Sequence, residues 1–225
     1  MAETRGRASR IVLKLVAAWM LLPLFFLVVG GSLAWWQAWV YCAILLVPMT
    51  VFAISMARSD PGFFDRRFKV REKEKAQRRL QAWGTPIFLA AFIVPGLDHR
   101  FGWSDPPLEA IVAAMPVALL GYLIVLRVFW ENRWAGRTVE TWTEQELVST
   151  GPYAIVRHPM YTGVIVMYLA TPIALGSWWG VLPALGTIPI LVTRIGNEEQ
   201  VLIRDLTGYD GYRQKVRYRL VPFVW

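Results

Sequence analysis

Six long apolar runs limit what this chain can fold into. They cover residues 11–31, 34–56, 83–97, 108–130, 162–176 and 178–193. A transmembrane helix needs about 20 mostly apolar residues, which the first, second and fourth runs supply and the others reach only with flanking residues. Charged residues make up 18% of the chain, against about 25% in an average soluble domain. We therefore expect an all-α, polytopic membrane protein with about six transmembrane helices.

The basic residues are distributed very unevenly between the loops of this predicted topology. The formal net charge is +8, nine basic residues lie within 58–79, and those after the fourth run lie before the fifth run or from Arg194 onward. Six crossings leave only Arg100 in an outer loop, a strong positive-inside pattern. It predicts an integral membrane protein with cytoplasmic N- and C-termini, in the inner membrane if the cell is prokaryotic. The basic surplus then reports topology and attraction to anionic membrane lipid, so nucleic acid is not an expected partner.

The chain divides into two predicted regions. Residues 1–82 form a transmembrane hairpin with a basic cytoplasmic loop, and residues 83–225 form a second transmembrane region that holds the candidate site within 132–222. The basic segment 60–81 predicts an amphipathic helix on the cytoplasmic lipid surface, with a solvated loop as the alternative. The first apolar run is long for a signal peptide, so we expect it to be retained. The lone cysteine, Cys42, excludes an internal disulfide and is expected to pack in the core.

A predicted helix start coincides with basic side chains at the fifth apolar run. Pro159 suits the first helical position, where its missing N–H is no loss. The N–H groups of Met160 and Tyr161 would then lack helical partners and face the cytoplasmic side, where the helix dipole favours an anion. With Arg157 and His158 beside them, they predict a carboxylate or phosphate site. The alternative is that Arg157 extends to the interface and His158 only caps the helix.

The residues around this helix start add two local predictions. A short extended or hairpin segment is expected to end in a turn at Gly151-Pro152. His158 and Tyr161 are three residues apart and share a helix face, while Gly163 allows another group to approach closely.

A second charged cluster follows the sixth apolar run. Arg194 and Glu198 are four residues apart and share a helix face, whereas Glu199 points about 100° away. An ordinary surface ion pair with a solvated neighbour is the alternative, but charged groups at a membrane boundary are functional candidates. Glu198 could accept a hydrogen bond from an ammonium or a ribose hydroxyl, so the two clusters could hold a zwitterionic, amino-acid-bearing cofactor. Residues 205–213 are expected to form a helix and turn over this site, where Tyr209 and Tyr212 pack.

These motifs, in this order, resemble the isoprenylcysteine carboxyl methyltransferase and phospholipid methyltransferase superfamily of integral membrane enzymes. The resemblance covers residues 132–222, about 40% of the chain. It rests on Gly151-Pro152-Tyr153, on Arg157-His158-Pro159-Met160-Tyr161-Thr162-Gly163, on Glu198-Glu199 with Leu202, and on Gly208-Tyr209-Asp210-Gly211-Tyr212. It implies a cytoplasmic pocket for S-adenosylmethionine, closed by the C-terminal helices and open sideways to a lipophilic methyl acceptor.

By position, the resemblance also implies the site residues. Cofactor contacts fall on Gln145, Glu146, Leu147, Val148, Tyr153, Arg157, His158, Pro159, Met160, Tyr161 and Glu198. Arg194 binds the acceptor and, with Glu198, is catalytic. Family members often carry glutamine or histidine contacts upstream of the Leu-Val pair, where this chain has Gln145-Glu146 and Thr138. The implied partners are a lipophilic or prenylated substrate and membrane lipid, with no metal.

The predicted function is therefore S-adenosylmethionine-dependent methylation of a lipophilic acceptor, either an isoprenylcysteine carboxylate or another lipid. Methyl transfer is an in-line displacement that depends mainly on positioning. Glu198 would balance Arg194, and for an amine acceptor Glu198 or Glu199 could remove a proton. Membrane sterol or steroid reductases, which use NADPH, look similar around Arg157-His158-Pro159, and the glutamates after Arg194 favour the methyltransferase. A non-enzymatic lipid-binding or transporter-like protein is the third alternative.

Overall fold

A computed structural model describes residues 2–64, 75–134 and 146–225, which form helices and no strand. In chain order the elements are α1 (Ala2–Gly30), α2 (Trp36–Ser59), α4 (Lys75–Phe101), α5 (Leu108–Glu131), the short 3-10 turn η1 (Gly151–Ala154), α6 (Pro159–Ala174), α7 (Val181–Asp205) and α8 (Tyr209–Lys215). Each predicted apolar run corresponds to one of six long helices in the described residues. The expected all-α fold is confirmed.

Four of these helices are long and apolar enough to cross a membrane. They are the segments Ser9–Gly30, Trp36–Ser59, Gln77–Phe101 and Leu108–Glu131. The 16 residues of α6 extend about 24 Å at 1.5 Å per residue, less than a hydrocarbon core of about 30 Å. The 25 residues of α7 include Arg194, Glu198 and Glu199 in its second half. The chain is thus a polytopic membrane protein in which the last two long helices are the least typical spans.

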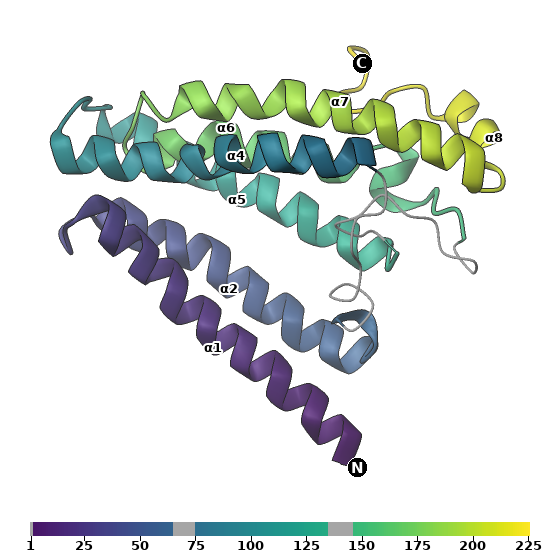
Figure 1. The fold of residues 1–225 in the computed structure, drawn as a ribbon, viewed down its shortest axis with the longest axis horizontal. Helices are drawn as coiled ribbons and strands as arrows, with labels where there is room; N and C mark the ends of the chain where they lie inside the picture. The colour runs from purple at the N-terminus through teal and green to yellow at the C-terminus, as the bar shows by residue number, and fades with distance from the viewer. Residues whose placement is uncertain (1, 65–74, 135–145) are drawn as a thin grey trace.

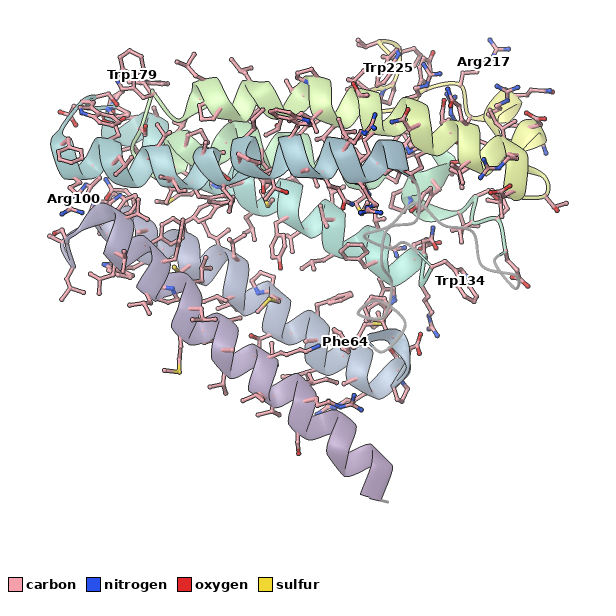
Figure 2. The ribbon with its side chains drawn as sticks, viewed as in Figure 1. Phe64, Arg100, Trp134, Trp179, Arg217 and Trp225 are labelled. Carbon is pink, nitrogen blue, oxygen red and sulfur yellow. The ribbon has the colours of Figure 1, made fainter. Side chains whose placement is uncertain are left out.

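The connections between the helices gather at two ends of the molecule (Figure 1). The links α1–α2, α4–α5 and α6–α7 lie at the left, and the last turns of α2 and α5, the first turns of α4 and helix α8 lie at the right. We call the second end, which holds the start of α4 at Lys75, the ends of α2 and α5 at Ser59 and Glu131, and α8, the basic end. Figure 2 shows Arg100 at the opposite end from Trp134 and Arg217, as the predicted topology requires.

Most of the predicted interfacial helix at 60–81 falls on residues 65–74, which lie outside the described part of the chain, so it stays a prediction. Helix α2 ends at Ser59, residues 63 and 64 are helical, and residues 75–81 form the first turns of α4. The polar residues from 77 to 81 are good helix formers, so a helix started at 75 propagates at little cost into the apolar run.

A buried core joins the N-terminal hairpin to the later helices. The Nε1 of Trp35 donates to the carbonyl of Leu175 at 3.0 Å, and the hydroxyls of Tyr41 and Thr171 are 2.5 Å apart. Cys42 is buried in the same cluster, which confirms its expected packing role. Beyond this core, α1 and α2 diverge from the α4–α7 bundle toward the basic end (Figure 1).

Helices α5 and α6 touch backbone to backbone. A Cβ added to Gly163 would lie 2.7 Å from the carbonyl oxygen of Gly121, and one added to Gly121 would lie 2.5 Å from the amide nitrogen of Met167. Small residues allow such close approach between membrane helices. The predicted close approach at Gly163 is confirmed, and the approaching group is the backbone of α5. This contact holds α6 directly against α5, and α6 begins at the candidate site.

A buried carboxylate, that of Asp98, holds together the end of the molecule opposite the basic end. Asp98 is fully buried and accepts hydrogen bonds from the backbone N–H and hydroxyl of Ser104, at 2.7 and 2.6 Å, and from the hydroxyl of Ser177, at 2.5 Å. These bonds tie the α4–α5 and α6–α7 links together. The ends of α4 and α6 and the starts of α5 and α7 are therefore held together at the end of the molecule opposite the basic end.

Candidate functional site

Pro159 is the first residue of α6, as predicted from its missing N–H. The next turn is tighter than expected. The N–H of Tyr161 donates to the carbonyl of His158 at 3.1 Å, and the N–H of Thr162 donates to the same oxygen at 3.2 Å. The expectation that the Tyr161 N–H lacks a partner is therefore wrong, because an i→i+3 bond satisfies it.

The basic side chains at this helix start already hold an anion, the carboxylate of Glu199. Its Oε1 accepts from the Nε of Arg157 at 2.7 Å and lies 3.3 Å from the Nε2 of His158. Its Oε2 accepts from the Nε of Arg219 at 2.8 Å. Glu199 is only 6% exposed, so the alternative of a solvated neighbour is wrong. The predicted anion site exists, and the carboxylate bound there belongs to α7.

Arg157 is also held from a second direction. Its Nη1 donates to the carbonyls of Val216 and Arg217 at 2.8 and 2.7 Å. Its side chain is 8% exposed, so the alternative in which it extends to the membrane interface is wrong. Charge-assisted hydrogen bonds of this kind are roughly twice as strong as neutral ones.

The residues after α8, 216–225, fold back along the start of α6, and we call them the C-terminal strap. The N–H groups of Arg157 and His158 donate to the carbonyls of Tyr218 and Arg219, both at 2.9 Å. The hydroxyl of Thr162 donates to the carbonyl of Leu220 at 2.8 Å. The strap thus satisfies the backbone N–H groups of the two residues that precede α6. It was missed in the sequence because its basic residues were explained by topology.

Arg194 and Glu198 are joined through a tyrosine. The Nε of Arg194 donates to the hydroxyl oxygen of Tyr161 at 2.8 Å, and that hydroxyl donates to Oε2 of Glu198 at 2.6 Å. Tyr161 is buried, whereas Arg194 and Glu198 are half-buried. The predicted shared face of the two charged residues is confirmed, with the α6 phenol as the bridge. The ring of His158 stacks on that of Tyr161 at 5.8 Å, which fixes the phenol from its other side.

The two adjacent glutamates therefore have different surroundings. Both oxygens of Glu199 are engaged by charged donors, and a further contact comes from the hydroxyl of Tyr209 at 3.5 Å. Within the described residues Glu198 accepts one side-chain hydrogen bond, from the hydroxyl of Tyr161, and it is partly exposed. Glu199 is thus a structural anion. Glu198 and Glu199 were the two groups predicted to remove a proton from an amine acceptor. Of these, only Glu198 has an oxygen free of charged donors within the described residues.

Helix α8 covers the Glu199 cluster, as predicted for a C-terminal helix and turn. Its Tyr209 and Tyr212 are both buried. The hydroxyl of Tyr212 donates to the carbonyl of Tyr153 at 2.7 Å. Burial raises the pKa of Tyr212 to about 12 and also raises that of Tyr209. Both phenols therefore stay protonated at neutral pH. The hydroxyl of Tyr212 can donate its hydrogen bond to the carbonyl of Tyr153, and that of Tyr209 to Glu199.

The remaining predicted contacts lie around the same cluster. The hydroxyl of Tyr153 accepts from the Nδ2 of Asn132 at 3.1 Å. Leu147 reaches within 3.6 Å of where a Cβ on Gly208 would lie, so 146–148 passes beside the turn into α8. Met160 packs against the apolar cluster below Tyr161. Glu146 is exposed and Val148 half-buried, while Gln145 and Thr138 lie outside the described residues.

The sequence and the fold of this chain are similar to those of known membrane methyltransferases. Residues 110–206 match the family model of phospholipid methyltransferases. The fold is similar to that of the eukaryotic intramembrane Ras methyltransferase, isoprenylcysteine carboxyl methyltransferase, with a TM-score of 0.53, 18% identity, and coverage of 97% of this chain and 75% of the other. The family match supports the superfamily predicted from the motifs, and the structural similarity shows the fold.

A second similarity is partial. The chain is 31% identical over 91 residues to the Delta(14)-sterol reductase of Mus musculus, which is 39% of this chain and 22% of the reductase. This chain therefore spans about a fifth of the length of that relative. The similarity does not favour the reductase alternative.

Proposed function

From this relationship we propose that the protein is an S-adenosylmethionine-dependent methyltransferase of the membrane. Its acceptor is lipophilic, of the isoprenylcysteine carboxylate class or another lipid. The observation that carries the proposal is the hydrogen-bonded chain from Arg194 through Tyr161 to Glu198, which lies inside the family match at 110–206. When bound, S-adenosylmethionine supplies an electrophilic methyl group on a sulfonium.

The chain's own residues supply positioning and charge. Arg194 is a half-buried cation, suited to orient a carboxylate acceptor through charge-assisted hydrogen bonds. Tyr161 holds the Nε of Arg194, so the guanidinium is oriented before the acceptor arrives. Glu198, two hydrogen bonds away, offsets part of the positive charge, and the acceptor carboxylate keeps its nucleophilicity. Such positioning is the main requirement of a displacement reaction.

The residues also fit parts of the cofactor. Glu198 has the exposure and charge to accept a hydrogen bond from its ammonium or a ribose hydroxyl. Arg157 and His158 face Glu199, so we assign them to positioning the end of α7. The other predicted contacts within the described residues, at 146–148, at Tyr153 and at 159–161, are still assigned to the cofactor under this proposal.

The orientation in the membrane is part of the same proposal. The described residues at the basic end include Arg78 and Arg79 at the start of α4, Arg213 and Lys215 in α8, and Arg217 and Arg219 in the C-terminal strap. The positive-inside rule supports a cytoplasmic position for this end. Both termini are then cytoplasmic, and the site faces the cytoplasmic leaflet, in the inner membrane of a prokaryotic cell. We retain the division into a hairpin, 1–82, and a catalytic region, 83–225, with the pocket within 132–222.

Ligand-dependent thermal stability separates the methyltransferase from the reductase. A ligand at 100 times its dissociation constant stabilises its protein by about 2.7 kcal/mol. We expect S-adenosylhomocysteine to raise the melting temperature of the detergent-solubilised protein and NADPH to leave it unchanged. The reverse result would assign the reductase function, and no shift with either ligand would favour a non-enzymatic protein. Mass spectrometry of lipid extracts incubated with isotope-labelled S-adenosylmethionine then identifies the acceptor class.

A further inference from the structure

The C-terminal strap carries a turn, residues 221–224, that we call the strap tip. Its apolar side chains are largely exposed: Phe223 by 89%, Val224 by 78% and Val221 by 46%. The ring of Phe223 contacts that of Tyr218, with centroids 5.3 Å apart, yet most of its surface stays uncovered. A single exposed apolar residue is ordinary, but several together on a segment between polar residues mark an interaction surface.

The backbone of the strap tip has an unusual conformation at Phe223. Its φ is 66°, and within residues 2–64, 75–134 and 146–225 it is the one non-glycine residue with a positive φ. A bulky side chain is strained in this region, where glycine is not. The turn is closed by the N–H groups of Val224 and Trp225, which both donate to the carbonyl of Val221 at 3.1 Å. Folding alone would favour glycine at 223, so the aromatic side chain there indicates a contact outside the protein.

The strap tip lies beside the apolar segments of the helices. Leu220, directly before the tip, is buried in an apolar cluster, and Trp225, directly after it, packs against the same cluster. The cluster also contains Leu191 and Val164, which lie within the sixth and fifth apolar runs. In Figure 2, Trp225 lies nearer the middle of the molecule than Arg217. The strap therefore returns from the polar end of the molecule to the level at which the helices contact lipid.

Basic side chains precede the strap tip along the chain. Arg213 and Lys215 of α8 and Arg217 of the strap are exposed. Basic residues next to an exposed apolar segment are typical of a chain that lies in the membrane–water interface. The apolar side chains there enter the boundary of the acyl chains, and the cations contact anionic headgroups. Charge and exposed apolar surface together therefore fit a membrane surface that contains anionic lipid.

We propose that the strap tip inserts into the lipid leaflet at the basic end, with the three basic side chains on anionic headgroups, and that the membrane thereby holds the strap against the start of α6. Arg219 of the strap donates to Glu199, and strap carbonyls accept from the two N–H groups that precede α6. Anionic lipid thus stabilises the candidate site from outside it. The inference does not depend on methyl transfer, and its tests measure position and hydrogen bonding instead of activity.

A fluorophore that is bleached in water locates the strap tip. Phe223→Cys is made together with Cys42→Ala, which removes the single native cysteine, and is labelled with nitrobenzoxadiazole. The protein is placed, one copy per disc, in nanodiscs of phosphatidylcholine and phosphatidylglycerol. We expect a nitroxide on the lipid acyl chains to quench the label and aqueous dithionite to bleach it slowly. Asp210→Cys in the same background is the control, because Asp210 is exposed on α8 and its label should show the reverse.

Three outcomes of this labelling would overturn the proposal. If dithionite bleaches the label at 223 as fast as the label at 210, the tip lies in water. If the label at 223 is protected both from dithionite and from the nitroxide on the lipid, a protein surface covers the tip. If protection appears only with two proteins per disc, that surface belongs to a second copy of this chain.

Amide hydrogen exchange tests whether the membrane holds the strap, with the native side chain in place. In wild-type protein, exchange at Arg157 and His158 should be slower in discs with phosphatidylglycerol than in discs of phosphatidylcholine alone. Arg217→Gln should weaken this lipid-dependent protection by about fivefold, the contribution of one basic side chain near an anionic surface. Phe223→Ser should abolish it, whereas Leu33→Ser, an exposed apolar residue in the α1–α2 link, should keep it. Equal exchange in both lipids for wild type, or a lipid dependence that survives in Phe223→Ser, contradicts the proposal.

Discussion

Replacing Glu199 with glutamine removes the negative charge that faces Arg157, His158 and Arg219 while keeping nearly the same volume. The Arg157 and Glu199 side chains are each 8% exposed, and that of Arg219 is 36% exposed. Removing one partner of a buried ion pair costs about 3–5 kcal/mol, because the other charge remains buried without compensation. The contribution of Arg219 is smaller, because solvent screens a side chain that is a third exposed.

This cost converts into a measurable change in melting temperature. For a chain of 150–250 residues, 1 kcal/mol corresponds to about 2–4 °C, so Glu199→Gln should lower the melting temperature by about 6–20 °C. Asp210→Asn makes the same change in net charge on α8, where Asp210 and its partner Arg213 are exposed. A surface pair contributes little, so this control should shift the melting temperature by less than about 4 °C.

Thermal unfolding of the detergent-solubilised variants, followed by tryptophan fluorescence, provides the comparison. The C-terminal strap should also become susceptible to proteolysis in Glu199→Gln, because Arg157 and Arg219 connect it to α6 and α7. If Glu199→Gln melts within the range of Asp210→Asn and its strap stays protected, the assignment of Glu199 as a structural anion is refuted.

Three further predictions address other parts of the structure. Arg194→Ala should abolish methyl transfer while S-adenosylhomocysteine binding largely survives, and loss of both would contradict its role toward the acceptor. Gly121→Ala should destabilise by about 1–3 kcal/mol in thermal unfolding, because its Cβ would lie 2.5 Å from the backbone nitrogen of Met167. Gly196→Ala, with nothing within 4 Å, should be neutral or stabilising, and equal effects would refute the close-packing account. Burial raises the pKa of Tyr212 from 10.0 to about 12, so its stabilising contribution is present below pH 10 and is lost as the pH rises toward 12. In melting temperatures recorded against pH, Tyr212→Phe should reduce this alkaline loss, and an unchanged profile would exclude Tyr212 as its source.

Features with a local cause were predicted well from the sequence. Pro159 sets a helix start through its own covalent geometry. Arg194 and Glu198 share a face because four residues make about one turn. The six apolar runs form six long helices for a reason that is also local. In lipid, each segment has to satisfy its own backbone hydrogen bonds.

The partners of Glu199 were harder to predict, because they depend on how distant segments return to one another. Arg157 and Arg219 lie 42 and 20 residues from Glu199 along the chain. Helical periodicity links only residues on one helix, so it carries no information about this cluster. A sequence pattern could locate the anion-binding side chains at the start of α6 without showing that α7 supplies the anion.

The positive-inside pattern also hid the role of one residue in the sequence. Arg219 was attributed to the positive-inside pattern, although it donates to Glu199.

Transfer of a labelled methyl group to an S-prenylated N-acyl cysteine by the purified protein tests the central claim most directly. The proposed function predicts that label from S-adenosylmethionine appears in a base-labile methyl ester with wild-type protein and is absent with Arg194→Ala. If the wild-type protein labels neither this acceptor nor any lipid of a membrane extract, while NADPH stabilises it against unfolding, the protein is not a methyltransferase.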